Sequence, residues 1–352
     1  NTFTEARLPW WTSLGLLTRG HMAETDPIAP HPTAGFSYFT CVLFCAVVGM
    51  TVVGVCLYGY YVGYTLFDWI HFSVMYIVTG MGITVGYHRL VAHQSFDCPD
   101  WVKRLVLIAG GWALQNSALI WGADHIRHHA RTDTDEDPYN ATRGFWHSHC
   151  GWLFYKTPHR LKKYEIRLRR DPVILWQHQY YWLIVISGLV IPFCVGFWWH
   201  GTLLGGISGL LMGGLLRMFM VLNSTFTINS LCHLVGSQPH GTQDSSRNSW
   251  LISFISFGEG YHNYHHTYAR DYRNGPRWYN FDPSKWIIYA LSLTGLATNL
   301  RRFDSQSFDP HGIFPSRTKV CYGPTGPYHF LYSSLMMITS TCTGGLSLLR
   351  ES

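Results

Sequence analysis

The stretch from Tyr38 to Gly59, YFTCVLFCAVVGMTVVGVCLYG, carries no charged side chain over its whole length. About 20 apolar residues cross the hydrocarbon core of a bilayer as a helix. The stretch is therefore long enough to predict a membrane-spanning helix. Composition agrees, because 47% of the 352 residues are hydrophobic and only 13% are charged, against about 25% charged in soluble domains.

Three further apolar stretches have spanning length. They cover residues 69–87, 180–199 and 201–222, and the last extends past Arg217 toward Ile228. The connections near residues 60–68 and at His200 lack Lys and Arg, whereas the long segments 88–179 and 229–352 hold most basic residues. By the positive-inside rule these long segments and both termini face the cytosol. We expect an all-α integral membrane protein with four transmembrane helices in two hairpins and a cytosolic helical cap.

The flanking segments are less informative. We divide the chain into a cytosolic segment at 1–37 with no signal peptide, a main domain at 38–304, and a tail of unknown structure at 305–352. The apolar stretch 329–347 fits either a further helix or disorder. The apolar stretch 101–121 predicts a helix that lies against the membrane or lines a cavity. A first residue other than Met indicates a fragment or a processed product.

Several classes of protein are disfavoured by composition. Nine Cys without a C-x-x-C pair give no zinc or disulfide pattern. Basic residues gather outside the apolar stretches, which suits anionic lipid headgroups, and a chain this apolar does not suit nucleic acid. Histidine stands out instead, with 20 residues.

The histidines form three clusters, each close to an expected membrane helix. They are His88-Arg-Leu-Val-Ala-His93, Asp124-His125-Ile-Arg-His128-His129 and Gly258-Glu-Gly-Tyr-His262-Asn-Tyr-His265-His266. In H-x-x-H-H the imidazoles occupy positions i, i+3 and i+4, which share one face of a helix. The eight imidazoles exceed the needs of one four-coordinate zinc and suffice for two metal ions.

Imidazole binds several metals, including zinc and iron. The position of the clusters at the membrane surface, beside an expected apolar cavity, favours iron. Paired irons can activate oxygen against an unactivated C–H bond, whereas zinc is redox-inert. Acidic neighbours suit the outer N–H groups of the histidine rings, although such residues are also common in solvated loops. These acids are Asp124, Asp133, Asp135, Asp137 and Glu259.

At these clusters the sequence resembles the membrane fatty-acid desaturases, specifically the stearoyl-CoA (delta-9) desaturase group, over roughly residues 40–300. Beside the three clusters, the motifs that carry the resemblance are Gly86-Tyr, Trp121-Gly-Ala, Asp133-Thr-Asp-Glu-Asp-Pro-Tyr139, Gly144-Phe-Trp146 and Asn229-Ser-Leu-Cys-His233. The resemblance implies two Fe²⁺ ions, O₂ as co-substrate, nine histidine ligands and Asn229 acting through water. The implied ligands are His88, His93, His125, His128, His129, His233, His262, His265 and His266.

The resemblance also implies a bent acyl tunnel. Gln115, Trp121 and Thr225 match residues that shape the bend, and Tyr76 and Gly80 match its closed end, where the small Gly80 predicts room for eighteen carbons. Simple helix packing would explain the same residues. The remaining implied substrate contacts are Asn116, Asp124 and Lys156, with Phe226 in place of a usual Trp.

The implied function is oxygen-dependent introduction of a cis double bond, at the delta-9 position, into a saturated long-chain acyl-CoA. Ala123 and Tyr155 replace basic CoA contacts of the mammalian members, so an acyl-lipid substrate stays open. A sphingolipid desaturase or a hydroxylase is the nearest alternative, and a metal transporter is a remote one, since only Asp68, His71 and Arg217 are ionisable at or near span ends.

The sequence implies an external electron donor, because it shows neither a His-Pro-Gly-Gly haem motif nor a Cys pattern for an iron–sulfur cluster. Cytochrome b5 or a ferredoxin fits this role. The implied location is the endoplasmic reticulum membrane in a eukaryote, or the cytoplasmic or thylakoid membrane in a bacterium.

Overall fold

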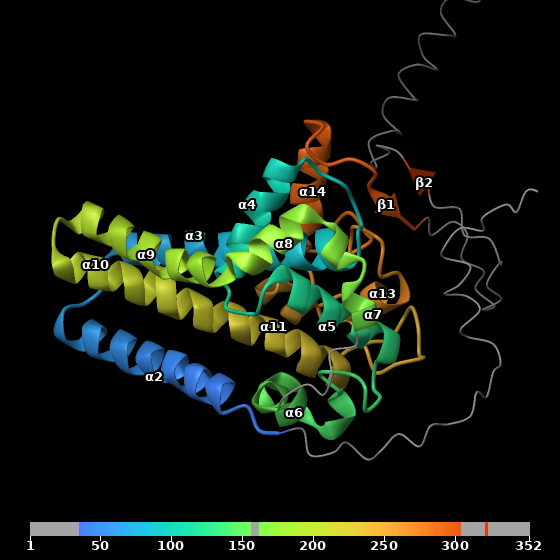
Figure 1. Ribbon diagram of the computed structural model, residues 1–352, viewed down its shortest axis with the longest axis horizontal. Coiled ribbons are helices and arrows are strands. Elements are labelled where there is room, and N and C mark those ends of the chain that lie inside the picture. Colours follow the sequence, from blue (N-terminus) through green and yellow to red (C-terminus); the bar gives the residue numbers. More distant parts are fainter. Residues whose placement is uncertain (1–34, 156–161, 304–320, 323–352) are drawn as a thin grey trace, which may run out of the picture. The chain divides into compact units, whose positions relative to one another are not determined.

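A computed structural model describes residues 35–155, 162–303 and 321–322, and helices dominate this part of the chain (Figure 1). Within it, four helices are long and apolar enough to cross a membrane, which confirms the four-helix prediction. The first is α2 (Tyr38–Tyr61) and the third is α9 (Tyr181–His200). The other two are composite. They are α3 (Leu66–Met81) with η2 (Gly82–Ala92), and α10 (Leu203–Gly209) with η6 (Leu210–Leu216) and α11 (Arg217–Leu234).

The chain connects the four helices as two successive pairs, α2 with α3 and α9 with α10. The second pair packs as a hairpin, whereas α2 packs on η6 of the fourth helix rather than along α3. Thr65 begins α3 through a capping box in which Asp68 accepts the Thr65 amide, so the helix starts at Leu66 rather than at the predicted Trp69. The second hairpin turns at Gly201, whose φ of +68° is the left-handed conformation that ends many helices.

Two of the helices are longer than a bilayer is thick. The fourth extends over 32 residues, or about 48 Å at 1.5 Å per residue, against a hydrocarbon core of about 30 Å. The second continues through a π-helical segment to Ala92. Their excess length carries residues from both helices into the cap, including Asn229 and His233 from α11 and His88 from η2.

The second helix and α4 (Asp100–Gly111) cross in close contact. A Cβ atom added at Gly82 would lie only 2.1 Å from the Gly110 amide nitrogen, so only glycine fits there. Small residues at such crossings let helix backbones approach each other in membranes. This contact fixes the π-helical segment, and hence His88, against the cap.

The expected helix at 101–121 is broken into two. α4 ends at Gly111, α5 (Ala118–Arg131) begins after Ser117, and residues 112–117 form a turn in which Leu114 and Asn116 have positive φ. Both helices belong to the cap, and Gln115 and Trp121 line a cavity. The expectation that this stretch lines a cavity is therefore met by the turn rather than by a single helix.

The rest of the cap consists of short elements, in Figure 1 gathered at one end of the long helices. One apolar core joins η2, α4, α5 and α8 (Pro172–Gln179). It includes Tyr87, Leu107, Leu119 and Val173, one from each of these helices. By contrast, only 11% of the apolar window of α2 is buried, as expected of a lipid-facing helix. The short elements are η3 (Ala141–Arg143), α6 (Phe145–His149), η4 (Gly151–Phe154), α7 (Lys162–Glu165), η5 (Leu168–Arg170), α8 (Pro172–Gln179), α12 (Trp250–Ile255), α13 (His262–Thr267), α14 (Pro283–Leu293), β1 (Arg301–Arg302) and β2 (Cys321–Tyr322), the last two paired antiparallel.

Candidate metal centre

All nine histidines named by the sequence lie in the cap, where they form two groups. In each group the candidate ligand atoms lie within 4.8 Å of one another, so each group can hold a metal ion. The five-histidine group contains His88, His93, His125, His129 and His265, and the four-histidine group contains His128, His233, His262 and His266.

Neighbouring histidines separate into different groups. His128 and His129 follow each other on α5, and His265 and His266 follow each other on α13, yet each pair divides between the two groups. In each H-x-x-H-H box the first and last histidines, four residues apart, join one group, and the histidine between them joins the other. The H-x-x-H-H spacing therefore serves two adjacent centres from the same short helix.

The ring nitrogens face one another at very short range. In the five-histidine group, Nε2 of His125 lies 2.8 Å from that of His93 and 3.1 Å from that of His129. In the four-histidine group, Nε2 of His262 lies 3.0 Å from those of His233 and His266. One nitrogen with two such neighbours cannot satisfy both by donating a single proton.

The opposite ring nitrogens explain which atom carries the proton. Nδ1 of His128 donates to Asp137 Oδ1 at 2.8 Å, and Nδ1 of His266 donates to Asp244 Oδ2 at 3.2 Å. A proton held on Nδ1 leaves a lone pair on Nε2, as in carboxylate–histidine–metal arrangements. Converging lone pairs repel unless a cation lies between them, so the donor set fits a bound metal ion.

His233 is held through an intermediate hydroxyl. Its Nδ1 lies 2.8 Å from Ser245 Oγ, and that hydroxyl donates to Asp133 Oδ1 at 2.7 Å. Asp133 and Asp137 thus lie where the sequence suggested, behind the histidine rings. Asp135 does not, because it pairs with Arg143 at 2.6 Å on the exposed side of the loop. Asp244 and Ser245 have no spacing signal in the sequence and were missed.

His88 is held by a buried ionic network. Its Nδ1 lies 2.8 Å from Glu259 Oε2, and Glu259 also pairs with Arg89 at 3.1 Å. Arg89 in turn lies 2.9 Å from Asp282, and Asp282 accepts the amides of Asn274 and other nearby residues. Arg89 and Asp282 were not singled out in the sequence, since their roles depend on contacts far along the chain.

Burial and neighbouring charges set the protonation states. Burial lowers the pKa of His129 well below its usual range, and the neighbouring imidazoles lower it further. Burial, then the surrounding imidazoles, do the same to the pKa of His262 and His265. Burial opposes ionisation of Glu259, but His88 and Arg89 more than offset this and lower its pKa. Neutral imidazoles and ionised carboxylates are the forms that bind and support a metal cation.

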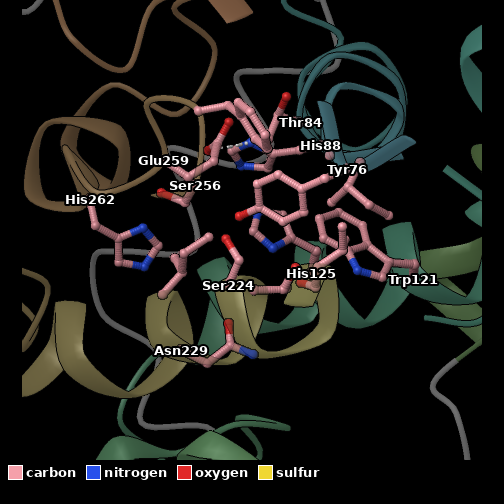
Figure 2. Close-up of a pocket in the computed structure, with 16 residues that line it drawn as sticks. Tyr76, Thr84, His88, Trp121, His125, Ser224, Asn229, Ser256, Glu259 and His262 are labelled. Carbon is pink, nitrogen blue, oxygen red and sulfur yellow. Dashed lines mark hydrogen bonds and ion pairs between the residues drawn. The ribbon is translucent and has the colours of Figure 1, made fainter. Parts of the chain in front are cut away.

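Asn229 lies on α11 one turn before His233, so both side chains share a face of the helix. Figure 2 shows Asn229 at the edge of a cavity that His88, His125 and His262 also line. The Asn229 side chain is thus close to the histidines that line the same cavity.

Two cavities meet at the histidines. The first extends toward Tyr76, Gly80 and Phe257. The second lies between α2 and the turn at 112–117. Four of the lining residues are common to both cavities, namely Trp121, His125, Thr225 and Asn229.

Hydrogen bonds join three side chains at the junction between the two cavities. Gln115 donates to Thr225 Oγ1 at 2.8 Å and accepts from the Trp121 indole at 3.1 Å. The Trp121 ring stacks on His125 at 4.9 Å between centroids. These three residues, which the resemblance linked to a bend, therefore lie together beside the five-histidine group.

An aromatic pair, Tyr76 and Phe257, lines part of the first cavity. The rings of Tyr76 and Phe257 lie 5.3 Å apart. Gly80 lies beneath Phe257, since a Cβ on Gly80 would fall 2.1 Å from Phe257 Cε2. The space that Gly80 leaves is occupied by the Phe257 ring, a residue that the sequence did not single out.

The other implied substrate residues divide. Asn116 and Phe226 line the second cavity. The backbone N–H of Asn116 donates to the Tyr181 hydroxyl at 3.0 Å. Asp124 is half-buried on α5 and does not line either of these two cavities. Lys156 and the apolar stretch 329–347 lie outside the described residues.

Comparison with known proteins agrees with this site. Residues 66–296 match the family model for fatty acid desaturases. The chain belongs to the fatty acid desaturase family. The match includes all nine histidines, and with the four apolar helices it identifies an integral, multi-pass membrane protein.

Individual relatives add detail. The chain is 40% identical to acyl-CoA desaturase 1 of Saccharomyces cerevisiae over 71% of its own length and 49% of the relative's. It is 38% identical to a probable acyl-CoA desaturase of Schizosaccharomyces pombe over 70% of this chain and 51% of the relative. It is 39% identical to an sn-2 palmitoyl-lipid 9-desaturase of a Nostoc strain over 62% of this chain and 75% of the relative. The chain thus spans about half the length of its two yeast relatives.

Proposed function

We propose that this chain is an oxygen-dependent fatty-acyl desaturase that introduces a cis double bond at the delta-9 position of a saturated long-chain acyl-CoA. The observation that carries the proposal is the junction of two cavities directly beside two groups of converging histidines. The yeast relatives are named as acyl-CoA desaturases, which supports the thioester substrate. The Nostoc relative is named for a lipid substrate, so an acyl-lipid is the second candidate.

We propose iron as the metal, held by the nine histidines, with Asn229 reaching one ion through water. A pair of iron ions bound there would supply the oxygen activation that removes two hydrogens from adjacent methylenes. The acyl chain gives two electrons and two protons, an external donor gives two further electrons, and O₂ takes up these together with two protons from solvent to become two waters. Cytochrome b5 or a ferredoxin is the donor we propose.

The chain's own residues position the substrate. Trp121, Gln115 and Thr225 form the junction, so an acyl chain that passes from one cavity to the other bends there. The bend presents one methylene pair to the histidines, and such positioning lowers the entropic barrier of a reaction. Phe257, with Tyr76, would set how far the methyl end reaches.

The test is expression in a host that lacks its own desaturase, followed by incubation of membranes with stearoyl-CoA or a stearoyl lipid. Mass spectrometry then locates any new double bond. We expect an alkene from the thioester, whereas an alcohol would favour a hydroxylase and a product only from the lipid would favour the second candidate.

Alanine variants complete the test. His128→Ala and His265→Ala should abolish the product while the protein still inserts, because each removes a ligand from a different group. His147→Ala is the matched control, since His147 is half-buried on α6 and belongs to neither group. Product from either ligand variant would contradict the assignment.

A further inference from the structure

Arg217 is an unexpected side chain for its position. It lies near the middle of the fourth helix, not near a span end as the sequence had suggested, and it is fully buried. A charged side chain inside a membrane segment is costly and normally has a function. The hydrogen bonds of its guanidinium go to three main-chain carbonyl oxygens from three different elements, at Gly188, Gly213 and Trp112.

The first carbonyl is free because of a proline. Gly188 lies on α9 four residues before Pro192, and proline has no N–H to donate to the carbonyl at i−4. The guanidinium Nη2 of Arg217 donates to this oxygen at 2.5 Å instead. The side chain thus satisfies a group that would otherwise lack a partner inside the membrane region.

The second carbonyl lies in the π-helical segment η6. The backbone amide of Arg217 bonds to the carbonyls of Met212 and Gly214, and so passes over that of Gly213. The Arg217 Nε donates to Gly213 O at 3.0 Å. The same side chain therefore stabilises the irregular turn of its own helix.

The third carbonyl lies just past the end of α4. Trp112 is the residue that follows the helix, and carbonyls at a helix end have no partner within that helix. The Arg217 Nη1 donates to Trp112 O. The Trp112 indole also donates to Ser187 Oγ at 3.0 Å, which ties the same residue to α9.

Trp112 begins the turn that leads to the bend of the cavities. Gln115 follows three residues later and bonds to both Thr225 and Trp121. Thr225 lies on the same helix as Arg217, two turns further on. One helix thus fixes the turn at 112–117 at two points, its start through Arg217 and its tip through Thr225.

We propose that Arg217 is a positioning residue that fixes the turn at 112–117 and thereby determines which methylene pair lies beside the histidines. This inference rests on the proposed desaturase function. Arg217 is not a catalytic residue, because it lines neither cavity. Its effect on the reaction passes through Trp112 and Gln115.

The experiment compares Arg217→Met, Arg217→Lys, Pro192→Ala and the double variant Pro192→Ala/Arg217→Met in the full chain. The readouts are the ratio of double-bond positional isomers, the bound metal and the melting temperature. Arg217→Met loses all three hydrogen bonds, but only the bond to Trp112 holds the turn. The preference for the main isomer should therefore fall about tenfold, the effect of that one bond, while bound metal stays unchanged. Lys should restore part of the preference, because it donates but lacks the planar fork of Arg.

The proline variant separates stability from positioning. Alanine at 192 restores an N–H for Gly188 O, so the double variant should melt at a higher temperature than Arg217→Met. Its preference for the main double-bond isomer should stay as low as in Arg217→Met. If Arg217→Met does not fold, the double variant takes its place in the isomer comparison. An unchanged isomer ratio in Arg217→Met or in the double variant would overturn the inference. An Arg217→Lys variant with a lower melting temperature and an unchanged isomer ratio would also overturn it.

These outcomes are distinct from failure of the proposed function. If the unaltered chain forms no alkene from any acyl substrate, the function itself is wrong. If the unaltered chain forms one alkene and the Arg217 variants form the same one, the function stands and the positioning role does not.

Discussion

The two histidine groups offer the same kind of ligand atom but differ in what lies behind the rings. In the four-histidine group, Asp137 and Asp244 hold two rings directly and Asp133 holds a third through Ser245. In the five-histidine group, Glu259 holds His88, and an arginine shares that carboxylate. The first group thus depends on several separate carboxylates, and the second on one buried network.

The comparison teaches that equal ligands need not give equal sites. Carboxylates behind a histidine fix its orientation and raise its basicity, so they strengthen metal binding. Removing one partner of a buried ion pair strongly lowers the stability of the fold, because the other partner is left as an uncompensated buried charge. Changes behind the four-histidine group should therefore affect metal affinity, whereas changes behind the five-histidine group should also affect folding.

The largest effect should come from the ligands themselves. His265→Ala and His266→Ala remove neighbouring rings that belong to different groups. Each variant should lose turnover to below detection and keep one bound ion, since the other group stays complete. Metal analysis of purified protein checks this, and loss of both ions from both variants would show that the groups are one interdependent site.

The next largest effect should come from the buried network. Glu259→Gln leaves fully buried Arg89 with Asp282 as its remaining acid, and should lower the free energy of unfolding by about 3 kcal/mol. Thermal unfolding in detergent measures the change. Asp135→Asn is the matched control, because its pair with Arg143 is exposed and such pairs contribute about 0–1 kcal/mol. Equal melting temperatures for the two variants would contradict the distinction.

A smaller effect on stability is expected at Asp244. Asp244→Asn removes the carboxylate behind His266 but not a buried ion pair, since the Asp244 side chain is 24% exposed. Metal affinity of the four-histidine group should fall by about 10- to 100-fold. Competition with a chelator measures it, and a loss from the five-histidine group instead would refute the grouping.

The smallest effect should come from Ser245→Ala. The hydroxyl links His233 to Asp133, with Asp133 remaining in place. Loss of one such hydrogen bond is worth about 1 kcal/mol. In the chelator assay, the loss of metal affinity should be smaller than for Asp244→Asn. A larger loss would mean that the Ser245 hydroxyl orients the His233 ring without help from Asp133.

Some expected features depended only on local pattern. The four helices follow from uninterrupted apolar length, and the family follows from histidine spacing that survives in the linear sequence. The nine histidines were named in advance, although His233 needed the resemblance because it stands alone in the chain. The carboxylates Asp133 and Asp137 were named as well, from their nearness to the second cluster.

Other features were not accessible in this way. Asp244, Ser245 and Phe257 gained their positions through contacts between distant segments. The break of the expected helix at 101–121 arises because the turn at 112–117 is held by Arg217 and Thr225 from another helix. Local propensity carries no information about such partners.

The sequence by itself determined that the chain enters a membrane four times and brings clustered imidazoles to its surface. Apolar length and ligand type are properties of neighbouring residues, so they can be read along the chain. Only the tertiary structure decided how the histidines divide into two groups, which acids support each, and where a buried arginine fixes the bend. Those outcomes depend on distances between segments that are separated by tens to hundreds of residues, and only folding brings these segments together.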